Sequence, residues 1–167
     1  MPGKQAKILT DHQIEDLLFY AAQSRHPIRN QLIVCLSIKA GLRAAEIAKL
    51  RWDMVLDADD KIGTVIELRD GIAKRRGGRL IPMHPCIRNI LGTWRTLTND
   101  YGPIIKSERG AGMEPGSIVL WFARAYRAIG LAGCSSHSGR RTFITRAARL
   151  LPKSGGSLRD VQLLAGL

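Results

Sequence analysis

The chain has 167 residues, of which 45% are hydrophobic, and this length supports one hydrophobic core but not two. Its formal net charge is +12 and its pI is near 10.4, so its surface attracts polyanions. Nucleic acid, an anionic membrane and a ribosomal role all fit this charge. The aromatic content of 5% argues against a single-strand binder built on stacking rings, so contact with duplex phosphates is the better hypothesis.

No apolar run reaches the roughly 18 residues that would cross a bilayer. The N-terminus also lacks the apolar centre of a secretory signal. The three cysteines, Cys35, Cys86 and Cys134, show neither metal-ligand spacing nor a paired framework. We therefore expect a soluble cytoplasmic protein with no membrane partner and no bound metal.

The N-terminal part of the sequence predicts three helices. Thr10 and Gln13 have the spacing of a capping box, which opens a first helix over about 10–23. A second helix over 27–41 begins with proline, ends at glycine and is apolar on most sides, so it is expected at the centre of the core. A short third helix follows over about 42–50.

The middle of the chain changes to a strand pattern. The segments "WDMVL", "TVIELRD" and "GRLIPM" are separated by turn-rich stretches and predict a small antiparallel sheet of three strands. Helices are expected again near 85–101, 115–130, 138–151 and 157–165. The predicted class is α+β, mainly helical, with the sheet between the N-terminal and C-terminal helices.

Two arginines occupy unexpected positions in these helices. In "HSGRRTFITRAARLL", Arg140 falls in the middle of the apolar face, near the helix end where the macrodipole is positive. In "GLRAAEIAKLRW", Arg43 shares a face with Ile47 and Leu50. A buried guanidinium without a partner costs several kcal/mol, so each needs a carboxylate or a bound anion.

Two explanations of these arginines stay open at this point. In the first, Arg43 and Glu46 form an ion pair at the edge of the core, and Arg140 bends its side chain outward to water. In the second, the arginines bind an anion, because His137 and the free backbone N–H groups of the helix start lie on the same side as Arg140. For His137 alone, a helix cap or a core position is the commoner explanation.

The stretch "GIAKRRGGR" is the densest basic segment of the chain. It holds Lys74, Arg75, Arg76 and Arg79 at the expected tip of a hairpin. Such a run is often a solvated turn, but it can equally lie along a phosphate backbone. Lys74 could bring one ammonium group, a proton donor, into a site formed by the helices.

These segments together resemble the tyrosine recombinases, also called the phage integrase family. "AGLRAAEIAKLRW" resembles the family's first arginine box, and "HSGRRTFITRAA" is similar to its H-x-x-R box. "KRRGGRLIPM" resembles the hairpin that carries the catalytic lysine, and "SLRDVQLLAGL" is similar to the segment that leads to the last catalytic motif. The four matches occur in the family's order and cover nearly the whole chain.

The resemblance implies phosphoryl transfer on double-stranded DNA without metal, cofactor or small-molecule substrate. Arg43 and Arg140 would bind the non-bridging oxygens of the scissile phosphate, and Glu46 would hold the arginines. Lys74 would protonate the leaving 5′ oxygen, and His137 would assist proton transfer. The additional basic residues expected to contact DNA are Arg75, Arg76, Arg79 and Arg141.

The sequence also departs from the family pattern. Leu167 stands where the family commonly has a histidine, and Tyr20, Tyr101 and Tyr126 all precede the H-x-x-R box, so none matches the nucleophile. We therefore expect residues 1–167 to be a single, incomplete catalytic domain without an N-terminal core-binding domain or a C-terminal tyrosine segment. It would be inactive alone and monomeric in solution, although recombinase protomers on DNA are expected partners.

Three functions are compatible with these motifs and this charge. The first is the catalytic domain of a site-specific recombinase or integrase of a mobile element, active in DNA integration or excision only as part of a complete protein. The second is a DNA-binding remnant without a nucleophile that regulates a complete relative or occupies its sites. The third is a general basic nucleic-acid protein of ribosomal type.

Overall fold

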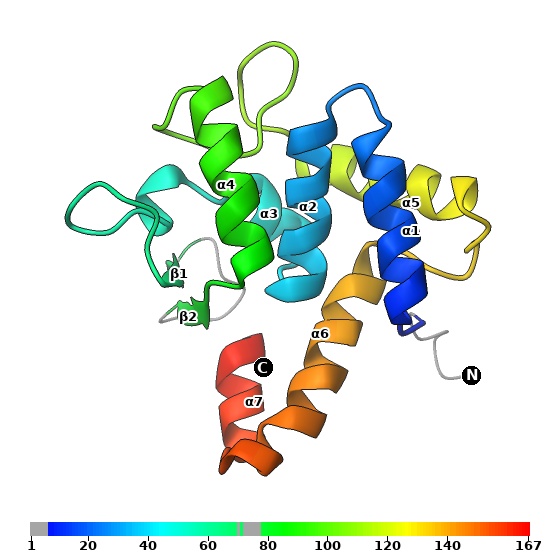
Figure 1. Cartoon of the computed structure of the whole chain (residues 1–167), viewed down its shortest axis with the longest axis vertical. Helices are drawn as coiled ribbons and strands as arrows, with labels where there is room; N and C mark the ends of the chain where they lie inside the picture. The colour runs from blue at the N-terminus through cyan, green and yellow to red at the C-terminus, as the bar shows by residue number, and fades with distance from the viewer. Residues whose placement is uncertain (1–6, 70, 72–77) are drawn as a thin grey trace.

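The computed structural model describes residues 7–69, 71 and 78–167. A group of helices comes first, a small sheet follows, and further helices complete the chain (Figure 1). The helices and strands are α1 (Asp11–Ala22), α2 (Pro27–Lys39), α3 (Ala44–Lys49), η1 (Trp52–Met54), β1 (Val65–Leu68), β2 (Arg79–Pro82), α4 (Pro85–Leu97), α5 (Pro115–Ala128), α6 (Ser136–Leu150), η2 (Pro152–Ser154) and α7 (Leu158–Ala165).

Helix α2 forms the centre of the core, as its apolar sequence predicts. Every residue from Leu32 to Ile38 is buried, and the helix packs against α1, α4 and α6. In Figure 1, α2 lies between α4 and α1, and α6 begins near its lower end. The crossing of α2 and α6 is close because Gly139 lies directly on Ser37, where a Cβ atom would collide with the hydroxyl oxygen.

The helix boundaries follow the capping signals of the sequence closely. Thr10 and Gln13 form the predicted capping box at the start of α1, and Pro27 is the first residue of α2. Helix α6 begins two residues earlier than predicted, because Ser135 caps it. Helix α4 ends at Leu97, four residues before the predicted end.

The prediction of a third strand over "WDMVL" is wrong. Residues Trp52–Met54 form the 3₁₀ helix η1, and the described residues contain one sheet of two antiparallel strands, β1 and β2. Met54 and Val55 are both buried, whereas a strand with one face on the core would alternate. Leu56 pairs with Ile62 only as an isolated bridge, because the intervening turn reverses the chain at once.

The register of the sheet sets the direction of the side chains on β2. Leu68 pairs with Arg79 and Ile66 with Ile81, and the buried positions alternate along both strands. Arg79 and Ile81 therefore point toward the core, and Leu80 points to solvent. The first residue of β2 thus carries a guanidinium group into the interior.

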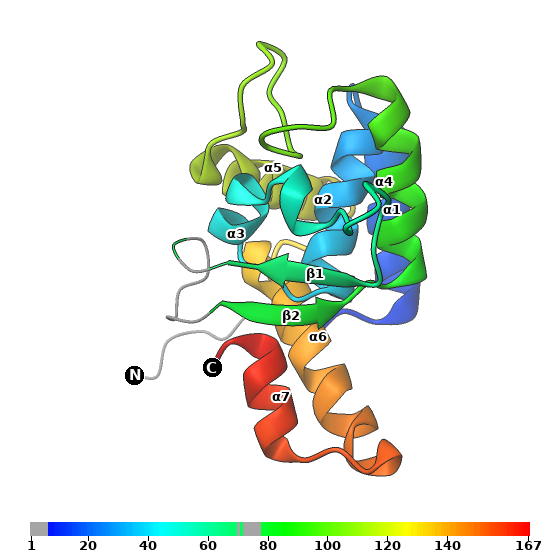
Figure 2. The same cartoon turned by 90° about the vertical axis from the view of Figure 1, so that its left-hand side faces the viewer.

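The last two helices extend away from the rest of the molecule and bring the chain back to the sheet. Helix α6 runs outward, η2 and Gly155 reverse the chain, and α7 packs against both α6 and β2. Figure 2 shows the end of α7 next to β2. In the part of the chain that the structure describes, no helix combines the length and the hydropathy that crossing a membrane requires.

Candidate active site

A buried ion pair between Glu46 and Arg79 forms the base of the site. Glu46 lies on α3 and is 1% exposed, and Arg79 enters from β2. Arg79 Nη1 donates to Glu46 Oε2 at 2.7 Å and Nη2 donates to Oε1 at 3.0 Å. This two-bond geometry fixes both side chains and is the strongest form of an arginine–carboxylate contact.

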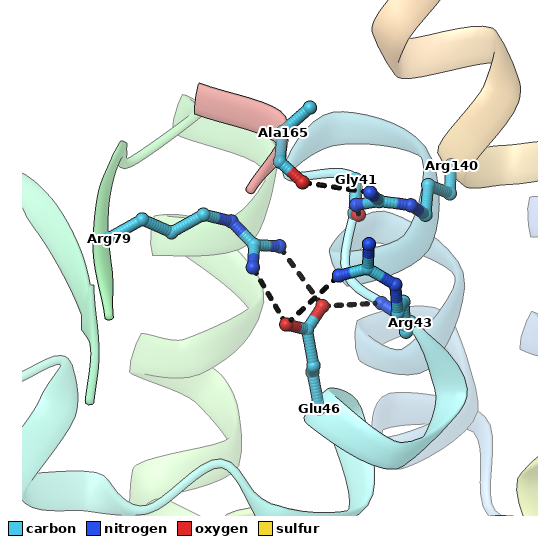
Figure 3. A network of polar contacts seen from close by, with 6 residues as sticks. All are labelled: Gly41, Arg43, Glu46, Arg79, Arg140 and Ala165. Carbon is cyan, nitrogen blue, oxygen red and sulfur yellow. Dashed lines mark hydrogen bonds and ion pairs between the residues drawn. The ribbon is translucent and has the colours of Figure 1, made fainter. Parts of the chain in front are cut away.

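Arg43 joins the same carboxylate from the start of α3. Its backbone N–H donates to Glu46 Oε1 at 2.9 Å, and its Nη1 lies 3.5 Å from Oε2 (Figure 3). Burial alone would raise the pKa of the Glu46 carboxyl, but the hydrogen bonds and charges of Arg79 and Arg43 lower this pKa below its usual value. Glu46 is therefore ionised, and it holds both arginines in place.

Arg140 reaches the cluster from α6 through two backbone carbonyls. Its Nη1 donates to Gly41 O at 2.8 Å, and its Nη2 donates to Ala165 O at 2.8 Å (Figure 3). Burial, together with the positive charges of Arg43 and Arg79, lowers the pKa of Arg140 to about 10, although the charge of Glu46 opposes this change. The side chain is fixed by neutral oxygens, so its positive charge is not cancelled by them.

The cluster has more positive charge and more hydrogen-bond donors than its own residues use. Three guanidinium groups face one carboxylate among the described residues, which leaves about two positive charges. Toward the described residues, Arg140 uses two of its five N–H donors, and Nη1 of Arg43 makes no hydrogen bond shorter than its 3.5 Å ion-pair contact with Glu46 Oε2. The arrangement can therefore bind an oxyanion where Arg43 and Arg140 meet.

The other residues singled out from the sequence are less closely associated with this cluster. His137 is exposed in the first turn of α6, and Arg141 is half-buried one residue after Arg140. The sequence predicted free N–H groups at the start of α6, but two of them are used. The backbone N–H of His137 donates to Ser135 Oγ, and that of Ser138 donates to Ser135 O. Lys74, Arg75 and Arg76 lie outside the described residues.

Arg79 lies in the interior of the site, a position that its place in the basic run of the hairpin did not predict. Its position in that run predicts a DNA contact, but it is 9% exposed and hydrogen-bonded to Glu46. The two-residue alternation that it shares with Ile81 is the signal for an inward side chain. The carbonyls of Gly41 and Ala165 give no comparable signal in a sequence, because backbone groups are common to all residues.

The sequence profile of the phage integrase family matches residues 7–166. The chain belongs to this family. Membership accounts for the resemblance of its four motifs to those of the tyrosine recombinases. Comparison with curated proteins gives no match.

Solved structures show the fold of this integrase-family chain in other proteins. The crystal structure of XerA recombinase has a TM-score of 0.77 and 21% identity, and the match covers 100% of this chain and 57% of that one. For the Tn1549 transposon integrase in complex with transposon right end DNA, the TM-score is 0.75 and the identity is 20%. That match covers 99% of this chain and 59% of the integrase. For a lambda integrase tetramer bound to a Holliday junction, the TM-score is 0.72 and the identity is 19%, and the match covers 97% of this chain and 47% of that one. This chain thus spans less than two thirds of the length of each of these proteins.

Glu46→Gln tests the importance of the one carboxylate that is buried among the described residues. The substitution keeps the shape of the side chain but leaves Arg79 and Arg43 without a counter-charge, which costs about 3–5 kcal/mol. For a chain of this size we expect the midpoint of thermal unfolding, measured by circular dichroism at pH 7, to fall by roughly 6–20 °C. The matched control is Glu67→Gln on β1, where the carboxylate is exposed and the expected change is small.

The loss of stability in Glu46→Gln should depend on pH. Because the folded-state pKa of Glu46 is lowered, its stabilising effect is complete above the usual value of 4.5 and is lost as the pH falls below it. The difference in stability between the wild type and Glu46→Gln should shrink as the pH is lowered from 5 toward 3, about the range in which a depressed carboxyl titrates. A difference that stays constant over this range would contradict the ion pair.

A substitution at Gly166 tests the contact between the end of α7 and Arg79. Gly166 has a φ of +71°, and a Cβ atom at this position would lie 2.9 Å from Arg79 Nη1. Gly166→Ala must therefore shift the guanidinium that Glu46 holds, in addition to straining the backbone. Gly155→Ala is the matched control, because Gly155 has a φ of +84° but open space around its Cβ position.

We expect Gly155→Ala to cost about 1 kcal/mol, from backbone strain alone. Gly166→Ala should cost at least about twice as much, because it adds the loss of a charge-assisted hydrogen bond. Denaturant unfolding measures both values. Equal losses for the two variants would show that α7 does not pack on Arg79 in solution.

Proposed function

We propose that this chain supplies the phosphate-binding part of a tyrosine recombinase catalytic domain. In the complete protein this domain would cut and rejoin double-stranded DNA by phosphoryl transfer, in DNA integration or excision. The observation that carries the proposal is the cluster of Arg43, Arg79 and Arg140 around the single carboxylate of Glu46. Membership of the phage integrase family and the fold shared with DNA-bound integrases support it.

In the proposed mechanism Arg43 and Arg140 bind the two non-bridging oxygens of one phosphodiester. Their remaining N–H donors are positioned before the substrate arrives, so little reorganisation is needed during the reaction. Attack by an oxygen nucleophile adds negative charge to the phosphate, which already carries one. An excess of about two positive charges therefore stabilises the transition state more than the ground state, as catalysis requires.

Glu46 and Arg79 act as positioning residues in this proposal. Glu46 orients Arg43 through the backbone N–H of Arg43 and through its carboxylate, and Arg79 holds Glu46. We accordingly assign Arg79 to the interior of the site, in place of the DNA contact expected from the sequence. Lys74 is proposed as the proton donor to the leaving 5′ oxygen, and His137, exposed at the start of α6, as an assisting group.

The proposed nucleophile is a tyrosine outside these 167 residues. Tyr126 is buried and stacks on Phe122, and burial raises the pKa of its phenol. Tyr20 packs against Trp121, and Tyr101 is exposed beside Lys106. Each of these tyrosines therefore has another environment, and we propose that residues 1–167 alone bind DNA without cleaving it.

Duplex DNA and further recombinase protomers are the proposed partners. Arg75, Arg76 and Arg141 would contact backbone phosphates and set the position of the chain on the duplex without reading its sequence. A lambda integrase dimer bound to a core site and a tetramer bound to a Holliday junction share the fold. The alternative function, a DNA-binding regulator without a nucleophile, rests on the same arginine cluster and on the environments of the three tyrosines.

DNA binding by two arginine variants tests this function. A nicked 30-base-pair duplex is titrated at several salt concentrations, because the salt dependence of the affinity reports how many phosphates the protein contacts. Arg140→Ala should weaken binding by about 10-fold or more, because it removes charge-assisted hydrogen bonds to one phosphate. Arg149→Ala, at an exposed position on the same helix, should weaken it only about 2- to 3-fold, as one generic contact does.

The same samples, run on a denaturing gel, test for covalent attachment. We expect no DNA joined to the wild-type chain, because the nucleophile is proposed to lie elsewhere. A covalent adduct would contradict that part of the proposal. Equal losses of affinity for Arg140→Ala and Arg149→Ala, with both variants folded by circular dichroism, would contradict the phosphate site itself and favour a general basic nucleic-acid protein.

A further inference from the structure

Two cysteines that are far apart in the sequence meet between α2 and α4. Cys35 is buried on α2, Cys86 is half-buried in the first turn of α4, and their Sγ atoms lie 2.7 Å apart. A disulfide has an S–S bond of about 2.05 Å, so the two atoms are less than about 1 Å from bonding distance. Both helices are well-packed parts of the core, and α2 contacts α4 extensively.

The surroundings of Cys86 make its thiol the reactive one of the pair. It lies at the N-terminal end of α4, where the helix dipole favours an anion, and its own N–H donates to His84 Nδ1. The hydrogen bond from Cys35 lowers the pKa of Cys86 to about 7; burial opposes this change and the charge of Lys39 supports it. The same contact, together with burial, raises the pKa of Cys35, which therefore stays a thiol.

We infer that Cys35 and Cys86 form an oxidant-reactive dithiol that closes to a disulfide between α2 and α4. The oxidant is of the peroxide class, with hydrogen peroxide as the simplest example. Cys86 is the attacking residue because it is partly exposed and close to a helix N-terminus. Cys35 is the resolving residue because it is already in contact with Cys86. This inference stands independently of the proposed function.

The chemistry balances without any further reactant. The Cys86 thiolate attacks one oxygen of hydrogen peroxide, so an S–O bond forms, the O–O bond breaks and hydroxide leaves. The sulfur of Cys35 then attacks the sulfur of Cys86, which forms the S–S bond and expels the oxygen as hydroxide. The two protons of the thiols convert both hydroxides to water, and the two electrons given up by the thiols reduce the peroxide.

The position of the pair links this reaction to the arginine cluster. Cys35 lies on the helix that leads to Gly41 and Arg43, and Cys86 follows β2, which carries Arg79. A covalent bond would tie together the two segments that supply these residues. It would also close a long loop, which restricts the unfolded chain and stabilises the folded one.

Oxidation of the whole chain with a small excess of hydrogen peroxide at pH 7.5 tests the inference. We expect the intact mass to fall by two hydrogen atoms and only one of the three cysteines to remain open to alkylation after denaturation. A peptide containing Cys35 joined to Cys86 should appear in the digest. The midpoint of thermal unfolding should rise by roughly 5–15 °C and return to its original value with dithiothreitol.

Cys134→Ser is the matched control, because Cys134 is also half-buried but lies apart from the pair, before α6. This variant should still lose two hydrogens on oxidation, whereas Cys86→Ser should lose none. Oxygen added to Cys86 while Cys35 stays free would overturn the inference, and so would a disulfide that uses Cys134. A Cys35–Cys86 bond that leaves the unfolding midpoint unchanged or lowers it would contradict the favourable geometry of the pair.

Discussion

The contact between the Glu46 carboxylate and the guanidinium of Arg79 is the interaction on which the rest of the site depends. It is buried at both ends, and it offers the only carboxylate that the described residues place among three arginines. If the cluster contained three carboxylates, its charge would be cancelled and it would bind no anion. If it contained none, the repulsion between buried guanidinium groups would destabilise the fold. One carboxylate fixes the geometry and leaves an excess of positive charge.

The cluster requires most of the chain to be folded. Arg43 follows α2, Arg79 begins β2, Arg140 lies on α6, and the carbonyl that holds Arg140 belongs to Ala165 at the end of α7. These segments are far apart in the sequence, and they meet because α2 packs against α3 and α6 while α7 packs against α6 and β2. The end of α7 contributes a carbonyl, which carries the partial negative charge of a helix C-terminus, and this stabilises the cation without neutralising it.

The sequence predicted the helices well because their signals are local. The capping box of Thr10 and Gln13 and the proline at position 27 mark helix starts without reference to the rest of the chain. The buried position of Arg140 also followed from helical periodicity. The third strand was wrong because "WDMVL" has strand-forming residues, but Trp52–Met54 form a 3₁₀ helix in which Trp52 is buried and its N–H donates to Gly102 O, a partner far along the chain. The inward direction of Arg79 follows from its two-residue alternation with Ile81, a signal that the basic run around it obscured. The contact of Cys35 with Cys86 depends on helix packing and could not be predicted from residue spacing.

Arg43 and Arg140 are proposed to bind one oxyanion together, and a crystal structure of the chain grown with tungstate tests this claim most directly. Tungstate has the shape and charge of a phosphate group, and its anomalous scattering locates it without ambiguity. We predict one tungstate within hydrogen-bond distance, about 2.7–3.2 Å, of both guanidinium groups, with Glu46 still paired to Arg79. Arginines turned apart into solvent, or tungstate bound only at other surfaces, would contradict the claim.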